Sequence, residues 1–135
     1  MVVPGGHRRQ RAVDTGSAVV DFVLVMVIAV PLVLGVIQLG LVLHVRNTLA
    51  AAASDGARYA GTIDRTPQDG VDRTRQLIGG ALVERYASQV SAAATTVDGY
   101  PGVVVRVHAQ VPALGLFGPS VDLNVTGHAV KETLP

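Results

Sequence analysis

The chain has 135 residues, of which 49% are hydrophobic and only 4% are aromatic, a length that suits one domain plus a membrane segment. A formal net charge of +1 gives no electrostatic case for binding nucleic acid. The sequence contains no cysteine, which excludes disulfides, thiolate metal ligands and thiol catalysis. An exported domain of this composition would have to be stabilised by packing alone.

A long apolar run extends from Phe22 to Val45, and its only clearly polar residues are Gln38 and His44. As an α-helix, the run would be about 36 Å long. A bilayer has a hydrocarbon core of about 30 Å, so this helix could span it with some tilt. We therefore predict a retained transmembrane helix and contact with the lipid bilayer.

Arginines precede the apolar run and set its expected orientation. Arg8, Arg9 and Arg11 stand before it, and only Asp14 offsets them. The positive-inside rule then places residues 1–16 in the cytoplasm and the C-terminal part outside. The expected location is the cell membrane of a bacterium, with a single pass.

Two other interpretations of the run are less favourable. The small residues at 51–53 could pass as a signal-peptidase site, but a secretory signal has an apolar region of only about 7–15 residues. A buried helix of a soluble protein would show a polar face, which this run lacks. Pro31 lies within the run and predicts a kink or a local break, although proline is also common in membrane helices.

An alanine-rich segment follows the apolar run over residues 46–61. Leu49, Ala53, Ala57 and Ala60 recur at helical spacing and form a stripe of mostly small side chains. We expect the membrane helix to continue through this segment and to stop at Gly61. The stripe fits either a simple stem helix or a surface that packs against another subunit.

The remaining residues, 62–135, predict a small extracytoplasmic α+β domain. Thr66 and Pro67 are helix-start residues, so we expect a helix over about 67–90. Its expected buried face consists of Val71, Ile78, Leu82 and Tyr86. The glycines at 79–80 would weaken it and could bend it.

Residues alternate between apolar and polar over 103–111 and again over 121–129, with the odd-numbered positions facing the core. We predict an antiparallel β-hairpin from these two strands, covered by the helix because an isolated hairpin is marginally stable. A short third strand is expected at Thr95–Val97. The apolar connection Leu114–Phe117 would either tuck under the helix or form an exposed patch for a partner.

The sequence shows no arrangement of residues typical of catalysis. His108 and His128 fall on the polar faces of the two predicted strands and could be cross-strand neighbours. A third ligand of suitable type and spacing is missing, so we expect two exposed histidines, no metal site and no cofactor. Neither a nucleophile elbow nor a phosphate-binding loop occurs, so we expect no enzymatic activity.

A short motif at the start of the apolar run stands out. It reads Gly16-Ser17-Ala-Val-Val-Asp21-Phe22, and Asp21 is an isolated carboxylate beside a lipid-spanning segment. Ionisable groups at such positions are costly and usually functional. The simpler interpretation is a helix N-terminal acid at the headgroup boundary, stabilised by the helix dipole.

The basic leader, this motif and the following apolar helix resemble the processing region of type IV pilin-like proteins. The chain most resembles the TadE/TadF group, minor pilin-like components of tight-adherence (Flp) pilus systems. The stem segment Ala53-Ser-Asp-Gly56-Ala57-Arg58 is similar to that group's alanine-rich segment, and two valine-rich strands at the C-terminus also fit. The resemblance covers most of the chain and is strongest over residues 16–61.

The resemblance implies a processing event and a set of partners. Gly16 would immediately precede the bond cut by a prepilin peptidase, and Ser17 would become the new N-terminus. Asp21 would be the fifth mature residue, where pilin-like proteins usually carry glutamate, and with Phe22 it would form an assembly contact. Other pilin-like subunits and membrane components of the assembly machinery are the implied partners.

Physical chemistry is consistent with such an assembly contact. A new ammonium at Ser17 and the Asp21 carboxylate would lie one helical turn apart and could pair within one chain. They could also pair between chains, where pairing would fix the axial register, because an unpaired charge in a low-dielectric bundle is costly. Aspartate is one methylene shorter than glutamate, which reduces its reach.

These observations favour a non-enzymatic minor pilin-like protein with four parts. We expect a leader at residues 1–16, a transmembrane helix at 17–45, a stem helix at 46–61 and a small domain at 62–135. A second hypothesis is an unprocessed single-pass envelope protein, anchored by its signal, that binds an extracytoplasmic partner. An accessory domain of an enzyme is a remote third.

Overall fold

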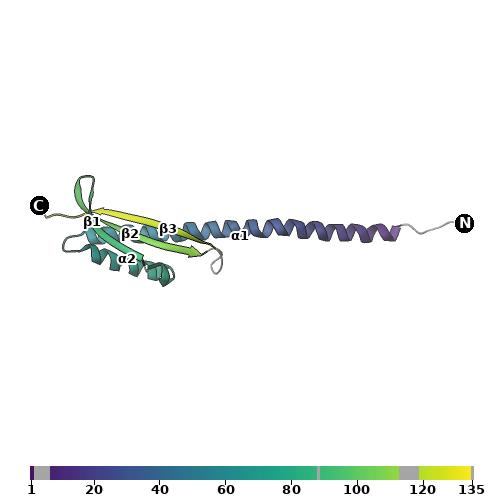
Figure 1. Ribbon diagram of the computed structural model, residues 1–135, viewed down its shortest axis with the longest axis horizontal. Coiled ribbons are helices and arrows are strands. Elements are labelled where there is room, and N and C mark those ends of the chain that lie inside the picture. The colour runs from purple at the N-terminus through teal and green to yellow at the C-terminus, as the bar shows by residue number, and fades with distance from the viewer. Residues whose placement is uncertain (2–6, 88, 113–118, 135) are drawn as a thin grey trace. The chain divides into compact units, whose positions relative to one another are not determined.

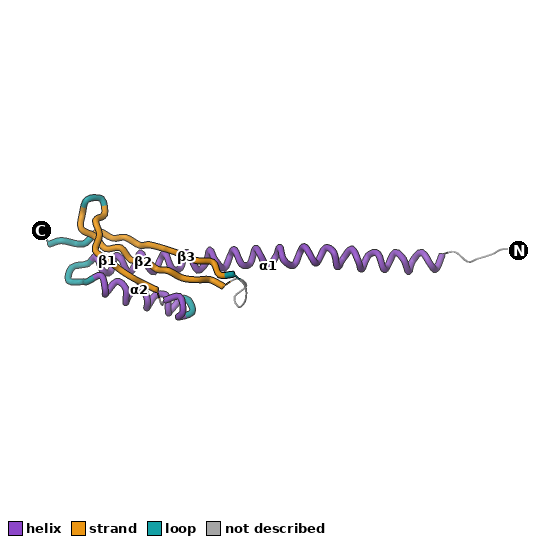
Figure 2. The backbone as a smooth tube through the Cα atoms, in the orientation of Figure 1, coloured by secondary structure: helices purple, strands orange, loops and turns teal. Residues whose placement is uncertain are grey.

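The computed structural model describes residues 1, 7–87, 89–112 and 119–134 and confirms an α+β fold (Figure 1). The predicted connection Leu114–Phe117 lies outside the described residues. The chain divides into two compact units, residues 1–37 and residues 38–135. Its elements, in chain order, are α1 (His7–Gly61), α2 (Pro67–Ala81), the 3₁₀ helix η1 (Glu84–Ala87), β1 (Gln89–Val97), β2 (Tyr100–Pro112) and β3 (Ser120–Val130) (Figure 2).

Helix α1 ends at Gly61, as the sequence predicted, and the chain stays α-helical through Pro31. Gly61 lies close to the end of β3, since a Cβ atom added to it would stand 2.8 Å from the Val130 carbonyl oxygen. The Gly61 carbonyl accepts a 2.7 Å hydrogen bond from the Glu132 backbone N–H. The end of the helix is therefore tied to the chain segment that follows the sheet.

Helix α2 begins with the cap that the sequence predicted. The Thr66 hydroxyl accepts a hydrogen bond of 3.3 Å from the Asp69 backbone N–H, and an Asp69 carboxylate oxygen accepts one of 2.7 Å from the Thr66 N–H. This reciprocal pair is a capping box, and Pro67 occupies the first turn. The predicted face is largely correct, because Val71, Ile78 and Tyr86 are buried.

The predicted end of this helix, near residue 90, is wrong. Helix α2 stops at Ala81, and Leu82 adopts an extended conformation with φ −134° and ψ 174°. Two adjacent glycines, Gly79 and Gly80, weaken the last turn because each costs about 1 kcal/mol relative to alanine. The chain then passes through η1 and enters β1 at Gln89.

The sheet has three antiparallel strands in the order β1-β2-β3. The predicted hairpin corresponds to β2 and β3, whereas the short third strand proved to be the nine-residue β1. Asp98 and Gly99 form the two-residue link between β1 and β2, with φ values of 50° and 84°. Two consecutive positive φ values are the signature of a type I′ turn, whose twist suits a tight hairpin.

One face of the sheet shares a single core with both helices. The alternation predicted for β2 is confirmed, because Val103, Val105 and Val107 are almost fully buried in that core. Val104 was expected on the polar face and is nevertheless buried, outside the core cluster. Val121 was expected in the core but is 41% exposed, because it lies near the end of the sheet where β3 begins.

Strand β3 lies directly against α1 at Gly127. A Cβ atom added to Gly127 would clash with the carbonyl carbon and oxygen of Ala53. Those atoms belong to the backbone, so no side-chain rotation could relieve the clash. The closeness of helix and strand therefore depends on the missing side chain at this position.

We predict that Gly127→Ala destabilises the folded unit by about 2 kcal/mol or more, within the range of overpacked cores. Gly80→Ala is the control, because an added Cβ there meets nothing within 4 Å and alanine favours the helix. Urea unfolding of the full chain in detergent micelles, followed by circular dichroism, measures both. Equal midpoints for Gly127→Ala and the parent would contradict the close packing of β3 on α1.

A second prediction concerns pH. Hydrogen bonds from the Thr66 backbone and side chain lower the pKa of Asp69 below its usual 3.8. A carboxyl whose pKa is lowered by folding stabilises the fold above its unfolded pKa, and this contribution is lost as the pH falls through the folded value. We therefore expect α2 to loosen below pH 3.8. The Asp69→Asn variant should lose that acid-dependent step in a titration followed by circular dichroism, and an unchanged step would contradict the cap's role.

Candidate functional site: the N-terminal apolar helix

The residues that the sequence singled out all lie on the first part of α1. Gly16, Ser17, Asp21, Phe22 and Pro31 are exposed. Phe22, the largest of them, is 60% exposed. From Thr15 to Ile37 every residue is exposed except one alanine that is half-buried. The helix thus presents large apolar side chains on every face.

Such a surface suits lipid better than water. The stretch Thr15–Gly61 contains an 18-residue window of mean hydropathy 2.8, none of which is buried inside the protein. The exposed part, residues 15–37, would be about 34 Å long as a helix. That length matches a hydrocarbon core of about 30 Å. By length and composition, α1 could cross a membrane.

The apolar run changes environment at Gln38. The Gln38 side chain donates a 3.3 Å hydrogen bond to the carbonyl oxygen of Pro112, at the end of β2. Val42 is partly buried against the core, and Val45 and Leu49 are buried within it. The last turns of the predicted span, from Gln38 to Val45, therefore pack with one face against the core of the folded unit.

Asp21 stands on the exposed apolar surface of α1. Ser17 precedes it by four residues, so their side chains lie on the same face of the helix, one turn apart. Within the part of the chain whose side chains are described, Asp21 takes part in no ion pair. The Asp21 carboxylate is therefore exposed on this surface, one helical turn after Ser17.

The small-residue stripe of the stem packs inside the chain. Leu49, Ala53, Ala57 and Ala60 are fully buried, with exposed fractions of 0%. Of the two interpretations of the stripe, the structure therefore supports a stem that packs within one subunit. A neighbouring row of small residues, Ala52 and Gly56 with Ala60, contacts α2.

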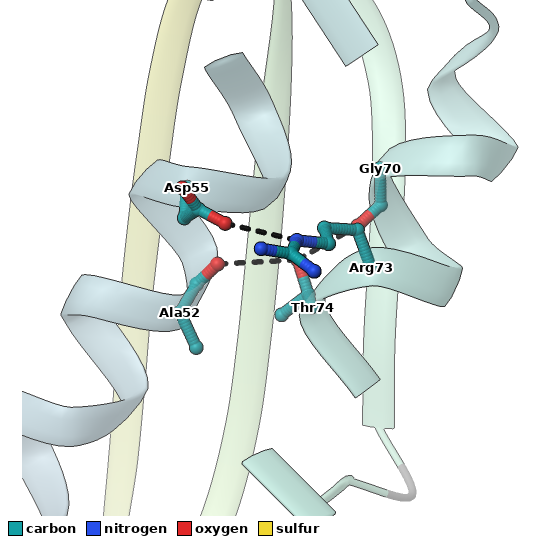
Figure 3. Close-up of polar contacts among 5 residues, drawn as sticks. All are labelled: Ala52, Asp55, Gly70, Arg73 and Thr74. Carbon is teal, nitrogen blue, oxygen red and sulfur yellow. Dashed lines mark hydrogen bonds and ion pairs between the residues drawn. The ribbon is translucent and has the colours of Figure 1, made fainter. Parts of the chain in front are cut away.

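Helix α2 approaches this row through Gly70 and Thr74. A Cβ atom on Gly56 would lie 2.7 Å from the Gly70 carbonyl oxygen, and one on Gly70 would lie 2.8 Å from the Ala60 Cβ. The buried Thr74 hydroxyl donates to the Gly70 carbonyl at 2.8 Å and lies 3.4 Å from the Ala52 carbonyl (Figure 3). The two helix backbones therefore nearly touch.

An ion pair borders the same helix contact. The Arg73 Nε atom lies 3.1 Å from an Asp55 carboxylate oxygen, with side chains 39% and 50% exposed (Figure 3). A pair this exposed contributes about 0–1 kcal/mol and mainly orients α2 on α1. Sequence reasoning missed both this pair and Thr74. The glycines at 56 and 70 were the available signal, since helical glycines often mark close packing.

The two histidines of the sheet are not neighbours. His108 pairs with Asn124 in the register, and His128 pairs with Val104. The expectation that they could be cross-strand partners is therefore wrong, because the β2–β3 register separates them by four residues. The His108 Nδ1 atom lies 2.7 Å from the Asn124 side-chain oxygen instead. No group of three metal-ligating side chains occurs in the described part of the chain.

Comparison with known proteins supports the resemblance seen in the sequence. Residues 16–58 match the TadE-like protein family. This stretch of the chain is TadE-like. No curated protein and no solved structure matches the chain.

The TadE-like stretch covers two structurally different parts of α1. Its first part, from Gly16 onward, is the exposed apolar part of the helix, and its second part is the buried stem. Within the stem motif, Ala53 contacts β3, Gly56 contacts α2 and Ala57 is buried in the core, while Arg58 is exposed. The TadE-like segment thus supplies both an apolar surface of membrane-spanning length and the surface on which the rest of the chain folds.

Proposed function

We propose that the protein is a non-enzymatic, TadE-like minor pilin or pseudopilin that takes part in assembling a tight-adherence (Flp-type) pilus or a related secretion apparatus. The observation that carries this proposal is the TadE-like match over residues 16–58, on a helix whose apolar part is fully exposed. That helix anchors the protein in the cell membrane, with residues 1–16 in the cytoplasm. The folded unit lies outside, where it contacts other components of the machinery.

Processing by a prepilin peptidase after Gly16 is part of the proposal. Gly16 is exposed and has open space around it, since an added Cβ would meet nothing within 4 Å. The matched family segment also begins at this residue. Cleavage would create an ammonium group at Ser17, one turn from Asp21. In the assembled state, the Asp21 carboxylate of one subunit would neutralise the terminus of its neighbour.

A second candidate function is an unprocessed, signal-anchored envelope protein that binds an extracytoplasmic partner. One observation favours it. The bond between Gly16 and Ser17 lies inside α1, which begins at His7, so the helix would have to open locally before a peptidase could cut. N-terminal sequencing of the protein produced with and without a prepilin peptidase separates the two functions.

We predict that Gly16→Leu slows cleavage by about tenfold or more, because a bulky side chain beside the cut bond clashes with a site shaped for glycine. Gly35→Leu is the matched control, since Gly35 is equally exposed on the same helix and an added Cβ there also meets nothing within 4 Å. Co-expression with a prepilin peptidase, followed by mass spectrometry of the N-terminus, measures the processed fraction. An intact leader in the unchanged protein, despite an active peptidase, would refute processing.

We further predict that Asp21→Ala leaves membrane insertion unchanged but impairs assembly. Removing one member of a buried charge pair leaves the other unpaired, at a cost of about 3–5 kcal/mol. Asp21→Glu should keep assembly. Asp55→Ala is a control that removes a carboxylate from an exposed ion pair of the folded unit. Recovery of the protein with other pilin-like subunits from membranes is the measurement, and normal recovery of Asp21→Ala would disprove charge pairing.

A further inference from the structure

Strand β1 forms one edge of the three-stranded sheet. It pairs only with β2, in a register that runs without a bulge from Gln89–His108 to Val97–Tyr100. Among the backbone hydrogen bonds of the described residues outside helices and strands, none involves β1. An open edge presents a row of unpaired N–H and C=O groups that can pair with another strand.

This edge lacks charge and proline, two of the features that usually protect edge strands. Proteins protect them with charged side chains, proline, bulges, short length or a covering segment. Strand β1 reads Gln-Val-Ser-Ala-Ala-Ala-Thr-Thr-Val over nine residues and contains neither a charge nor a proline. The opposite edge, β3, carries Asp122 and is followed by Lys131 and Glu132. The two edges therefore differ in charge.

Strand β1 has exposed side chains on both faces of the sheet. Ala93 is exposed on the open face of the sheet, while Ala94 and Thr96 are exposed on the face that the helices cover elsewhere. Alanine is depleted in strands because it fills a pleated surface poorly. The small side chains of β1 leave space beside the strand for a further strand.

We propose that a second copy of this chain occupies this edge, and that its β3 pairs with β1 to continue the sheet from copy to copy. The proposal rests on the proposed membrane insertion, because all copies would then have the same orientation. Strands β1 and β3 are both antiparallel to β2, so they run in the same direction. Copies oriented alike can therefore join β1 to β3 as parallel neighbours.

Pairing of two β1 edges would be an isologous contact about a twofold axis. The β1–β3 contact is instead heterologous, and such contacts generate rings or open rows. Because β1 carries no charge, Asp122 of the neighbouring β3 meets no like charge across the new pair.

The absence of cysteine allows a direct cross-linking test. Ser91, Arg106 and Thr126 stand at one level across the three strands, and Ser91 and Thr126 are exposed. Lateral continuation of the sheet would place Thr126 of one copy beside Ser91 of the next. Within one chain these two positions lie two strands apart, about 10 Å, which exceeds the reach of a disulfide.

The experiment oxidises membranes that contain the full chain with the double variant S91C/T126C. We expect a ladder of disulfide-linked dimers, trimers and larger species. Each single variant should stay monomeric. A ladder that fails to form in the double variant would overturn the proposal. Dimers formed by S91C alone would also overturn it, since they would mean that two β1 edges meet.

A charge placed on the edge provides the second arm. Ala93→Lys in the S91C/T126C background should reduce the ladder about tenfold, because a lysine on an edge strand opposes pairing. Ala81→Lys is the matched control, since Ala81 is exposed at the end of α2 and belongs to no strand. Thermal unfolding shows whether both variants fold, and a ladder that Ala93→Lys leaves intact would count against the edge.

Processing is measured in the same membranes, so that the two proposals can fail separately. Normal cleavage after Gly16 without a ladder would refute only the edge pairing. A ladder formed by a chain that is never cleaved would refute only the processing step.

Discussion

The fold depends on the small side chains of the stem of α1. Gly56 lets the backbone of α2 approach α1, and Ala53 meets the backbone of β3 at Gly127. These contacts leave no room for larger residues, so two elements pack against one helix at nearly the minimum possible distance. Dispersion between closely packed backbones and the exclusion of water from the valines of β2 then stabilise a core with few aromatic residues. The alanine-rich composition of the stem is a requirement of this packing.

The same reasoning explains how one helix serves two environments. Beyond Val45 the helix carries charged residues such as Arg46 and Asp55, so its hydropathy falls. Its buried side chains also become smaller. Before Gln38 the helix exposes large aliphatic residues that suit lipid, and after Val45 its buried positions are mostly alanine and glycine. The Gln38 side chain donates a hydrogen bond to the Pro112 carbonyl oxygen at the end of β2. This polar residue therefore marks the point where the folded unit begins.

Much of this architecture could be predicted from the sequence, because it rests on local signals. The cap at Thr66, the end of α1 at Gly61 and the alternation in β2 are each encoded by adjacent residues. Strand β1 was largely missed because its three consecutive alanines resemble the helix before it. The Asp98–Gly99 pair between two runs of β-branched residues was the signal for a hairpin, and it was overlooked.

Features that depend on register or on distant contacts could not be read from one sequence. The separation of His108 from His128 follows from the β2–β3 pairing, which alternation alone does not fix. The contact between Gly56 and Thr74 joins positions from two helices whose faces must first be aligned. The early motif around Gly16 and Asp21 is a different case, because it was visible in the sequence and lies on the exposed part of α1.

That difference bears on function. In the folded unit, polar groups find partners within the chain, as Asp55 does with Arg73, and no buried side-chain polar atom among the described residues lacks a hydrogen bond. Asp21 stands on an apolar surface in no ion pair with the described side chains, and β1 is an edge strand of the sheet. Evolution tolerates such features where something outside the chain completes them. The polar groups of the core are thus satisfied within one copy, and the helix and the sheet edge are the two parts for which we propose partners.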